Sequence, residues 1–287
     1  MTKTADPAAE AAKPLLPLFY KTLQPLHGKV HGDWRLKPGD CAFAADSPFV
    51  PIVVGELADA ARDYPVVFAG DPEQPVPVVI LGLDRVNLFV EDGQWDKGAH
   101  IPAYVRRYPF NFLSVPEPEG FALTIDAGSD RVARGGTEGA ALFEDGKPSE
   151  VTRQMLAFCN AFRVEADATR AFTLALKAQG LLVDGTANAT LPNGRTLGLN
   201  GFQIVDTEKF SKLPDAVVLD WHNSGYLAWV YYHMASLSRF KALYARQVAR
   251  GAVTQASPVP ASDTDTAGVA PESDAPATKS KSKKVPA

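Results

Sequence analysis

The apolar positions of this chain follow strand-like spacing through much of its first half. Between residues 48 and 146, short β-branched and aromatic runs alternate with Gly, Pro and Asp, the pattern of strands joined by turns. One stretch of helical spacing, about Glu56 to Asp63, interrupts these runs. Three dipeptides tolerate the positive φ angles of tight hairpin turns: Asp92-Gly93, Asp145-Gly146 and Asn193-Gly194. We therefore expect a β-rich N-terminal part.

Helical spacing dominates from residue 149 onward. An apolar stripe follows Ser149, a suitable N-cap, and consists of Val151, Met155, Phe158 and Phe162. Asp167 is a second possible N-cap, and it predicts a separate helix that ends at Gly180. The pattern thus predicts two consecutive helices in this region.

The remaining part of the chain returns briefly to strand character and then becomes helical again. Residues 181–205 read as strands around a hairpin turn, and a long final helix is predicted from Pro214. Gly225 is expected to break or bend this helix. His233 falls within its aromatic stripe, where the favoured interpretation is a hydrogen-bonded core histidine.

The β-rich part contains an internal similarity. Residues 62–68 and 106–112 share the pattern Arg-x-Tyr-Pro-apolar-x-Phe, and an apolar strand follows each copy. Each copy then reaches a Leu-Phe pair shortly before Glu-Asp-Gly, at residues 88–93 and 142–146. We interpret the copies as two related β units that complete one core together, with chance or convergent strand chemistry as the alternative.

These patterns predict an α+β fold with three regions along the chain. Residues 1–16 form a flexible N-terminus, and residues 17–250 form one domain, β-rich over 48–146 and mainly helical over 149–250. Residues 251–287 hold almost no large apolar side chains and are rich in Ala, Pro, Ser, Thr and Asp. Because such a composition buries too little surface to offset ordering entropy, we expect a disordered tail.

Composition excludes several classes of protein. A formal net charge of −4 argues against a nucleic-acid binder, since that binding needs Lys and Arg at phosphates. The most apolar stretches, 76–83 and 226–234, are far shorter than the ~20 residues that cross a bilayer as a helix. The N-terminus lacks a signal-peptide pattern, and only two cysteines occur. We therefore expect a soluble cytoplasmic protein, not a permease.

The best candidates for ligand binding lie in one short segment. Arg106 and Arg107 are expected on an extended segment, with side chains on opposite faces, so that one points into a cleft or the core. A guanidinium binds carboxylate or phosphate in bidentate fashion. The competing interpretation is an inward arginine paired with a structural acid such as Asp63 or Asp126. Candidates for an aromatic ligand surface are Trp95, Tyr104, Tyr108 and Trp34, with a core role as the alternative.

A metal site is a second candidate. His31 and Asp33 have the His-x-Asp spacing that begins a two-histidine, one-carboxylate iron site. The spacing is common by chance, and a surface turn or strand-edge pair is the competing interpretation. A second histidine would have to come from elsewhere in the fold, and the possible donors are His27, His100, His222 and His233.

Several segments resemble the SapC family of bacterial proteins. They include residues 17–20, 64–68 and 87–95, and the most specific is the run 101–110, Ile-Pro-Ala-Tyr-Val-Arg-Arg-Tyr-Pro-Phe. The resemblance covers most of residues 17–243. It implies a setting linked to bacterial surface-layer (S-layer) or outer-envelope systems, and it carries over no catalytic residue. The peptide-permease label often attached to the family conflicts with the absence of a spanning segment in this sequence.

No complete catalytic or cofactor motif occurs, so the sequence leaves the cofactor unknown and the function open. The leading hypothesis is an accessory or binding protein that meets a protein partner of a surface-layer or envelope system. The alternative is a metal-dependent enzyme acting on a peptide or small acidic substrate, with His31 and Asp33 at the metal. A purely structural subunit is a third possibility.

Overall fold

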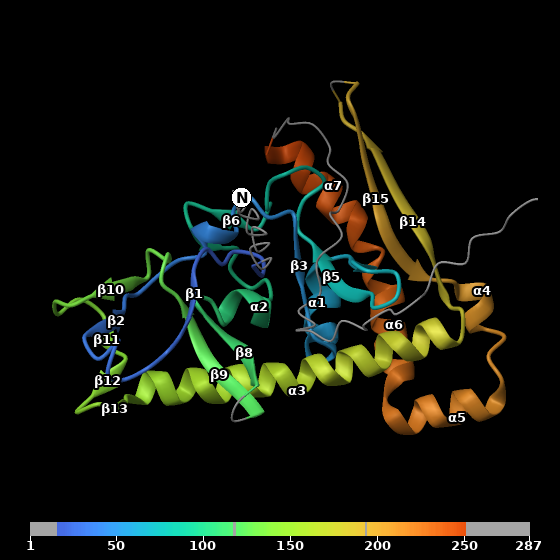
Figure 1. Ribbon diagram of the computed structural model, residues 1–287. Helices are drawn as coiled ribbons and strands as arrows, with labels where there is room; N and C mark the ends of the chain where they lie inside the picture. The colour runs from blue at the N-terminus through green and yellow to red at the C-terminus, as the bar shows by residue number, and fades with distance from the viewer. Residues whose placement is uncertain (1–15, 117–118, 193, 251–287) are drawn as a thin grey trace, which may run out of the picture.

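The computed structural model describes residues 16–116, 119–192 and 194–250 and confirms the α+β class (Figure 1). The predicted flexible N-terminus, except Leu16, and the predicted disordered tail lie outside these residues. Within them, most strands come before residue 149 and most helices after it. Hairpins and helices surround a central antiparallel sheet.

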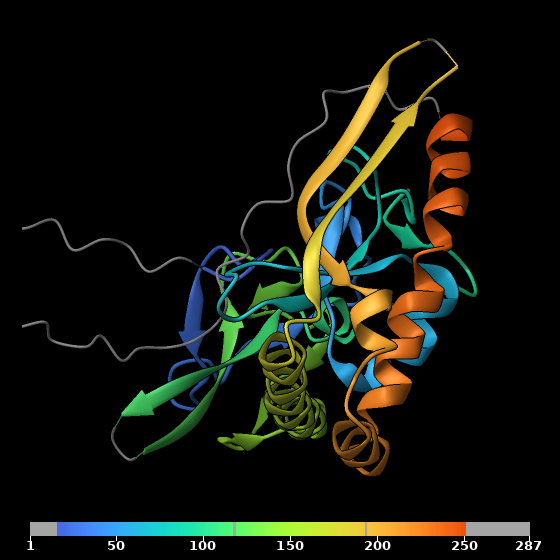
Figure 2. The same cartoon turned by 90° about the vertical axis from the view of Figure 1, so that its right-hand side faces the viewer.

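The largest sheet has five antiparallel strands in the order β14-β15-β4-β5-β3. Their bounds are β3 Phe49–Pro51, β4 Val66–Ala69, β5 Val76–Ile80, β14 Leu182–Thr190 and β15 Thr196–Val205. The first three are almost fully buried, because apolar residues occupy both faces of each strand. The hairpin β14–β15 is longer than its neighbours and extends beyond them as a two-stranded arm (Figure 2).

Smaller sheets complete the β-rich part. One has the order β1-β9-β8 and another the order β10-β2-β11. Their bounds are β1 Leu23–Pro25, β2 Trp34–Leu36, β8 Phe110–Pro116, β9 Glu119–Asp126, β10 Val132–Arg134 and β11 Ala140–Ala141. Two short hairpins join β6 Val90–Glu91 to β7 Gln94–Trp95 and β12 Phe143–Glu144 to β13 Lys147–Pro148.

The sequence predicted the turns of these two short hairpins correctly. Asp92 and Gly93 have φ angles of 48° and 75°, and Asp145 and Gly146 have 50° and 74°. Positive φ at both central residues matches the right-handed twist of the strands that the turn joins. The third predicted turn includes Asn193, which lies outside the described residues.

The two sequence copies also share an order of elements. In the first, α1 (Leu57–Asp63) leads through Tyr-Pro into the pair β4–β5 and then the hairpin β6–β7. In the second, α2 (Ala103–Arg106) leads through Tyr-Pro into β8–β9 and then β12–β13, with β10 and β11 inserted. The strand pairs belong to different sheets.

The helix after Ser149 is continuous, which corrects the prediction of two helices. The helix α3 spans Glu150–Ala178, 29 residues, and the Ser149 side chain caps its start by accepting from Thr152 N. Asp167 lies within it and does not start a second helix. No Gly or Pro separates the predicted halves, so nothing in the backbone forces a break.

The C-terminal part consists of separate helices where one long helix was predicted. They are α4 Thr207–Phe210, α5 Asp215–Ser224, α6 Tyr226–Ser236 and α7 Arg239–Arg250. Gly225 adopts φ 81°, a left-handed conformation that ends α5, so the predicted break is confirmed. The second break, after Ser236, has no glycine or proline to signal it.

Two hydrophobic clusters fill the interior, and α3 contributes to both. The larger cluster surrounds the five-stranded sheet and includes Phe172 and Leu176 of α3. The smaller lies under β8 and β9 and includes Cys159 of the same helix. As Figure 1 shows, α3 runs beneath both β regions and reaches the C-terminal helices. The long helix thus joins the two β units.

His233 fastens the C-terminal helices to the central sheet. The residue is fully buried, and its Nε2 accepts a hydrogen bond of 3.1 Å from Val205 N. Its Nδ1 lies 2.9 Å from the Val66 carbonyl, so the neutral tautomer with a proton on Nδ1 satisfies both contacts. Burial lowers the pKa of His233 to about 4. The predicted core role of this histidine is therefore confirmed.

Candidate functional site

The two candidate arginines lie on a helical turn, not on the extended segment that the sequence predicted. Arg106 is the last residue of α2 and Arg107 is its C-cap, after the N-cap Pro102. Proline with φ −54° is already suited to the start of a helix, which accounts for the turn. The two side chains nevertheless point in different directions, as expected, one outward and one inward. The Arg106 side chain is 46% exposed, whereas Arg107 is 5% exposed.

Arg107 lies in an aromatic cage inside the protein. Its guanidinium carbon is 4.2 Å from the ring centre of Tyr104, 4.4 Å from that of Phe162 and 5.9 Å from that of Tyr20. A planar, weakly hydrated cation interacts favourably with such ring faces. Because Phe162 belongs to α3, Arg107 connects α2 to the long helix. Its surroundings are those of a residue in the core.

Arg106 lies beside a buried carboxylate that the sequence did not nominate. Its Nη2 is 3.6 Å from Oε1 of Glu56, and its Nε donates to the Ile101 carbonyl at 3.0 Å. Of the two acids that the sequence suggested for the inward arginine, Asp63 pairs with Arg62, and Asp126 accepts from the Tyr108 hydroxyl. The sequence did contain a local signal for this contact. Glu56 is the one acidic residue in the apolar run 52–57, and a carboxylate that is buried there needs a partner.

Glu56 holds the segment 100–106 against the start of α1. Its Oε1 accepts from Ala103 N at 2.6 Å and lies 2.8 Å from Nε2 of His100. Its Oε2 lies 3.4 Å from the donor Val53 N. A buried carboxylate needs this number of donors to offset its lost hydration. The cluster of Glu56, His100 and Arg106 is thus an anchor for the most specific segment of the sequence.

The candidate aromatic residues are buried and form internal hydrogen bonds. Tyr108 donates to Oδ2 of Asp126 at 3.1 Å, and Tyr104 donates to the Leu18 carbonyl at 3.3 Å. Trp95 donates to the Tyr64 hydroxyl at 2.9 Å. Burial raises the pKa of Tyr108, which keeps its phenol protonated. The structure therefore places Trp95, Tyr104 and Tyr108 in the core.

His31 and Asp33 do not meet at a metal-binding arrangement. His31 is buried, its Nδ1 accepts from His27 N at 2.9 Å, and its ring packs 4.3 Å from that of Trp34. Asp33 is exposed. Among residues 16–116, 119–192 and 194–250, no three His, Cys, Asp or Glu side chains come together as metal ligands would. A turn that packs His31 on Trp34 explains the geometry without a metal.

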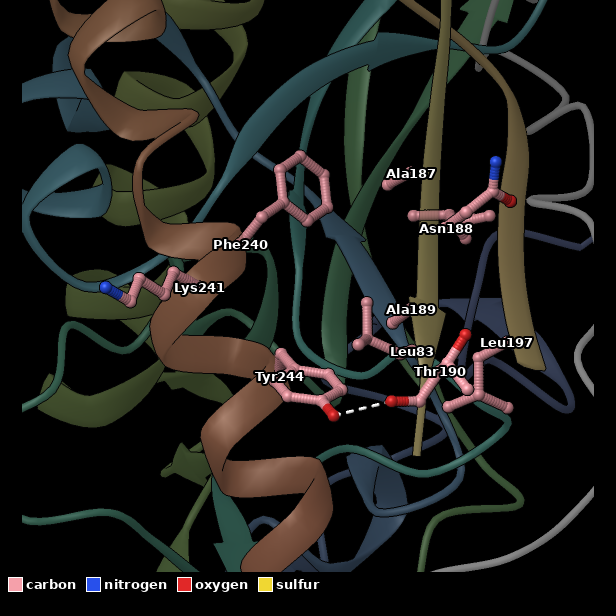
Figure 3. A pocket seen from close by; sticks show the side chains of 10 residues that line it. Leu83, Ala187, Asn188, Ala189, Thr190, Leu197, Phe240, Lys241 and Tyr244 are labelled. Atoms are coloured by element: carbon pink, nitrogen blue, oxygen red, sulfur yellow. Dashed lines mark hydrogen bonds between the residues drawn. The ribbon is translucent and has the colours of Figure 1, made fainter. Parts of the chain in front are cut away.

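A pocket of about 430 Å³ lies elsewhere, between the hairpin β14–β15 and α7 (Figure 3). Pockets of this size hold small molecules in proteins. The hairpin contributes one wall, α7 contributes the other, and Leu83 comes from the loop after β5. The lining residues are Leu83, Ala187, Asn188, Ala189, Thr190, Leu197, Leu199, Phe240, Lys241 and Tyr244.

Small side chains on one face of the hairpin account for this hollow. Ala187 pairs with Leu199 and Ala189 pairs with Leu197, so all four belong to alternating positions on one face. The two leucines are buried, whereas the two alanines are only partly buried. Space remains where larger residues on β14 would fill the gap.

Contacts at both ends fix the walls of the pocket. Near the hairpin tip, the Tyr244 hydroxyl donates to the Thr190 carbonyl at 2.6 Å, as Figure 3 shows. Nearer the sheet, the rings of Phe202 and Phe240 stack with centres 6.1 Å apart. The hollow is therefore bounded by specific contacts. Sequence analysis missed it because its walls come from segments that are distant in the chain.

The described residues thus form an α+β protein with a preformed, mostly apolar pocket and an arginine segment in which Arg107 is buried and Arg106 is half-exposed. None of their helices combines the length and apolar character needed to cross a membrane. The SapC family model matches residues 26–243, more than half of the chain, so the protein belongs to the SapC family. No curated protein and no solved structure matches the chain.

Proposed function

We propose that this protein is an accessory binding protein of a bacterial surface-layer or envelope-associated system, and that the hairpin–α7 pocket is its ligand site. The pocket is the observation that carries the proposal. It is preformed, and six of its ten lining residues have hydrocarbon side chains, which is usual for a ligand-binding pocket. Family membership supports the surface-layer setting, through the resemblance described above.

The arginine segment has a different role in this proposal. Glu56 and the aromatic cage hold the 100–108 segment inside the protein, where it positions α2 against α3. Of the six candidate ligand-binding residues, only Arg106 has a well exposed side chain, whereas the others are buried. A protein partner would therefore meet Arg106 and not the buried residues around it.

Deletion and complementation in the bacterium that makes the protein test the proposal. We expect deletion to reduce the surface-layer or envelope protein retained on washed cells, and the wild-type gene to restore it. The variant Ala189→Trp places an indole in the pocket, so it should fail to restore retention. The matched control Thr196→Trp adds the same group at an exposed hairpin position outside the lining and should restore it.

Accumulation and thermal unfolding of each variant are measured in parallel, so that a folding failure is recognised. If Ala189→Trp does not fold, Ala187→Phe fills the same hollow from the neighbouring position on the same face of β14, two residues away. Retention that is unchanged by deletion would contradict the surface-layer role. Full restoration by folded, pocket-filled variants would contradict the assignment of the ligand site.

A further inference from the structure

We infer that the hairpin–α7 pocket binds the hydrocarbon chain of a single-chain amphiphile and leaves its polar head group at the rim. This inference rests on the proposed function only for the location of the ligand site. It adds the chemical class of the ligand, which neither the family nor the pocket's position specifies. Three features of the lining support it.

The first feature is the chemistry of the two walls. Six lining side chains are hydrocarbon: Leu83, Ala187, Ala189, Leu197, Leu199 and Phe240. They come from the hairpin, from α7 and from the loop after β5, so apolar surface meets a ligand from several sides. A sugar or nucleotide would leave most of its polar groups without partners against such walls. A hydrocarbon chain has no such groups.

The second feature is the placement of the polar groups. The Tyr244 hydroxyl and the Thr190 carbonyl already bond to each other near the hairpin tip. The Asn188 side chain lies on the outer side of the hairpin in Figure 3. The Tyr244 hydroxyl is therefore already hydrogen-bonded and the Asn188 amide points away from α7, so neither group requires a polar ligand inside the hollow.

The third feature is the direction of the one lining charge. Lys241 belongs to α7, and its ammonium group points away from the hairpin in Figure 3. Within the described residues, no carboxylate lies within 4.0 Å of that group. Because no lining charge points into the hollow, the pocket should recognise the chain and largely ignore the charge of the head group.

Calorimetric titration of the full-length protein with butanoate, hexanoate, octanoate and decanoate tests the inference. Each buried methylene is worth about 0.8 kcal/mol, so affinity should rise roughly tenfold for each two-carbon extension until the pocket is full. Octanamide, the neutral counterpart of octanoate, should bind within about threefold of it. Lys241→Gln should also change octanoate affinity by less than about threefold.

Two variants locate the binding. Ala189→Trp should weaken decanoate at least about tenfold by occupying the space of several methylenes, while the control Thr196→Trp binds as the wild type does. Ala187→Phe replaces Ala189→Trp if the latter does not fold. Affinity that is flat along the series, or equal in the pocket-filled variants, would overturn the inference. If those variants still abolish surface-layer retention, the proposed function stands and only the ligand class is wrong.

Discussion

The hydroxyl of Tyr244 donates a 2.6 Å hydrogen bond to the carbonyl of Thr190, and this contact joins the last helix to the tip of the longest hairpin. The two residues are far apart in sequence and lie on opposite walls of the pocket. The hairpin tip extends beyond β4, so neighbouring strands do not hold it. The spacing between the walls therefore depends on contacts with α7.

Removing this hydroxyl should loosen the hairpin tip. We expect Tyr244→Phe to lower the free energy of unfolding by about 1 kcal/mol, the usual value of one hydrogen bond. The backbone N–H of Leu191 donates to the Arg195 carbonyl within the tip. Hydrogen exchange of this amide should become roughly fivefold faster. Tyr232→Phe, on the exposed side of α6, serves as the control and should change neither quantity. Unchanged exchange in Tyr244→Phe would show that the tip is held by other contacts.

The two adjacent arginines should differ sharply in their effect on stability. Arg107→Ala removes a side chain from its aromatic cage, and we expect it to cost roughly 2–4 kcal/mol in urea unfolding. Arg106→Ala removes a half-exposed side chain and should cost about 1 kcal/mol or less. Equal losses would contradict the assignment of Arg107 to the core. A search for protein partners should therefore use Arg106→Ala alone.

The buried carboxylate of Glu56 should matter more than its exposed neighbours on α1. Glu56→Gln can keep its amide oxygen at the donors Ala103 N and His100, but its amide nitrogen then faces the donor Val53 N. We expect a loss of about 2–3 kcal/mol in urea unfolding, because hydrogen bonds to charged groups are the stronger ones. Asp59→Asn on the same helix is exposed and should be nearly neutral. A loss no larger than that of the control would contradict the anchoring role.

His233 should make the protein less stable in mild acid. Its pKa is about 4 in the folded protein, below the value near 6.5 expected for an unfolded chain. The unfolded state therefore binds a proton first as the pH falls, and stability that is complete above pH 6.5 is lost progressively down to pH 4. The loss should approach roughly 3 kcal/mol.

Comparison with His233→Gln isolates this contribution. Glutamine has no group that titrates in this range, so the part of the pH dependence due to His233 should disappear, although the variant is less stable at neutral pH. Urea unfolding at pH values from 4 to 7 measures both proteins. Parallel curves for the two would contradict a neutral, buried His233.

The sequence predicted those features that local rules determine. Asp92-Gly93 and Asp145-Gly146 adopt hairpin turns because few other residues tolerate positive φ, and Gly225 ends a helix for the same reason. Ser149 caps α3 as expected. His233 was placed in the core from its position within an apolar stripe. Each of these assignments depends on a few neighbouring residues.

Features that depend on distant contacts were missed or misassigned. The contact of Arg106 with Glu56 was missed, because it arises only when α2 packs near α1. The pocket requires β14 and α7 to lie side by side, which no local pattern specifies. One signal was available: Ala187 and Ala189 are small residues on the face where Leu197 and Leu199 are large, and such a mismatch marks space that another element must fill.

The central claim is that the hairpin–α7 pocket holds a ligand, and native mass spectrometry tests it most directly. Wild type, Ala189→Trp and the control Thr196→Trp are purified under gentle conditions from the bacterium that makes the protein. We predict a bound small molecule on the wild type and on Thr196→Trp, and the bare chain mass for Ala189→Trp. A bare mass for all three proteins, or the same bound molecule on folded Ala189→Trp, would contradict the claim.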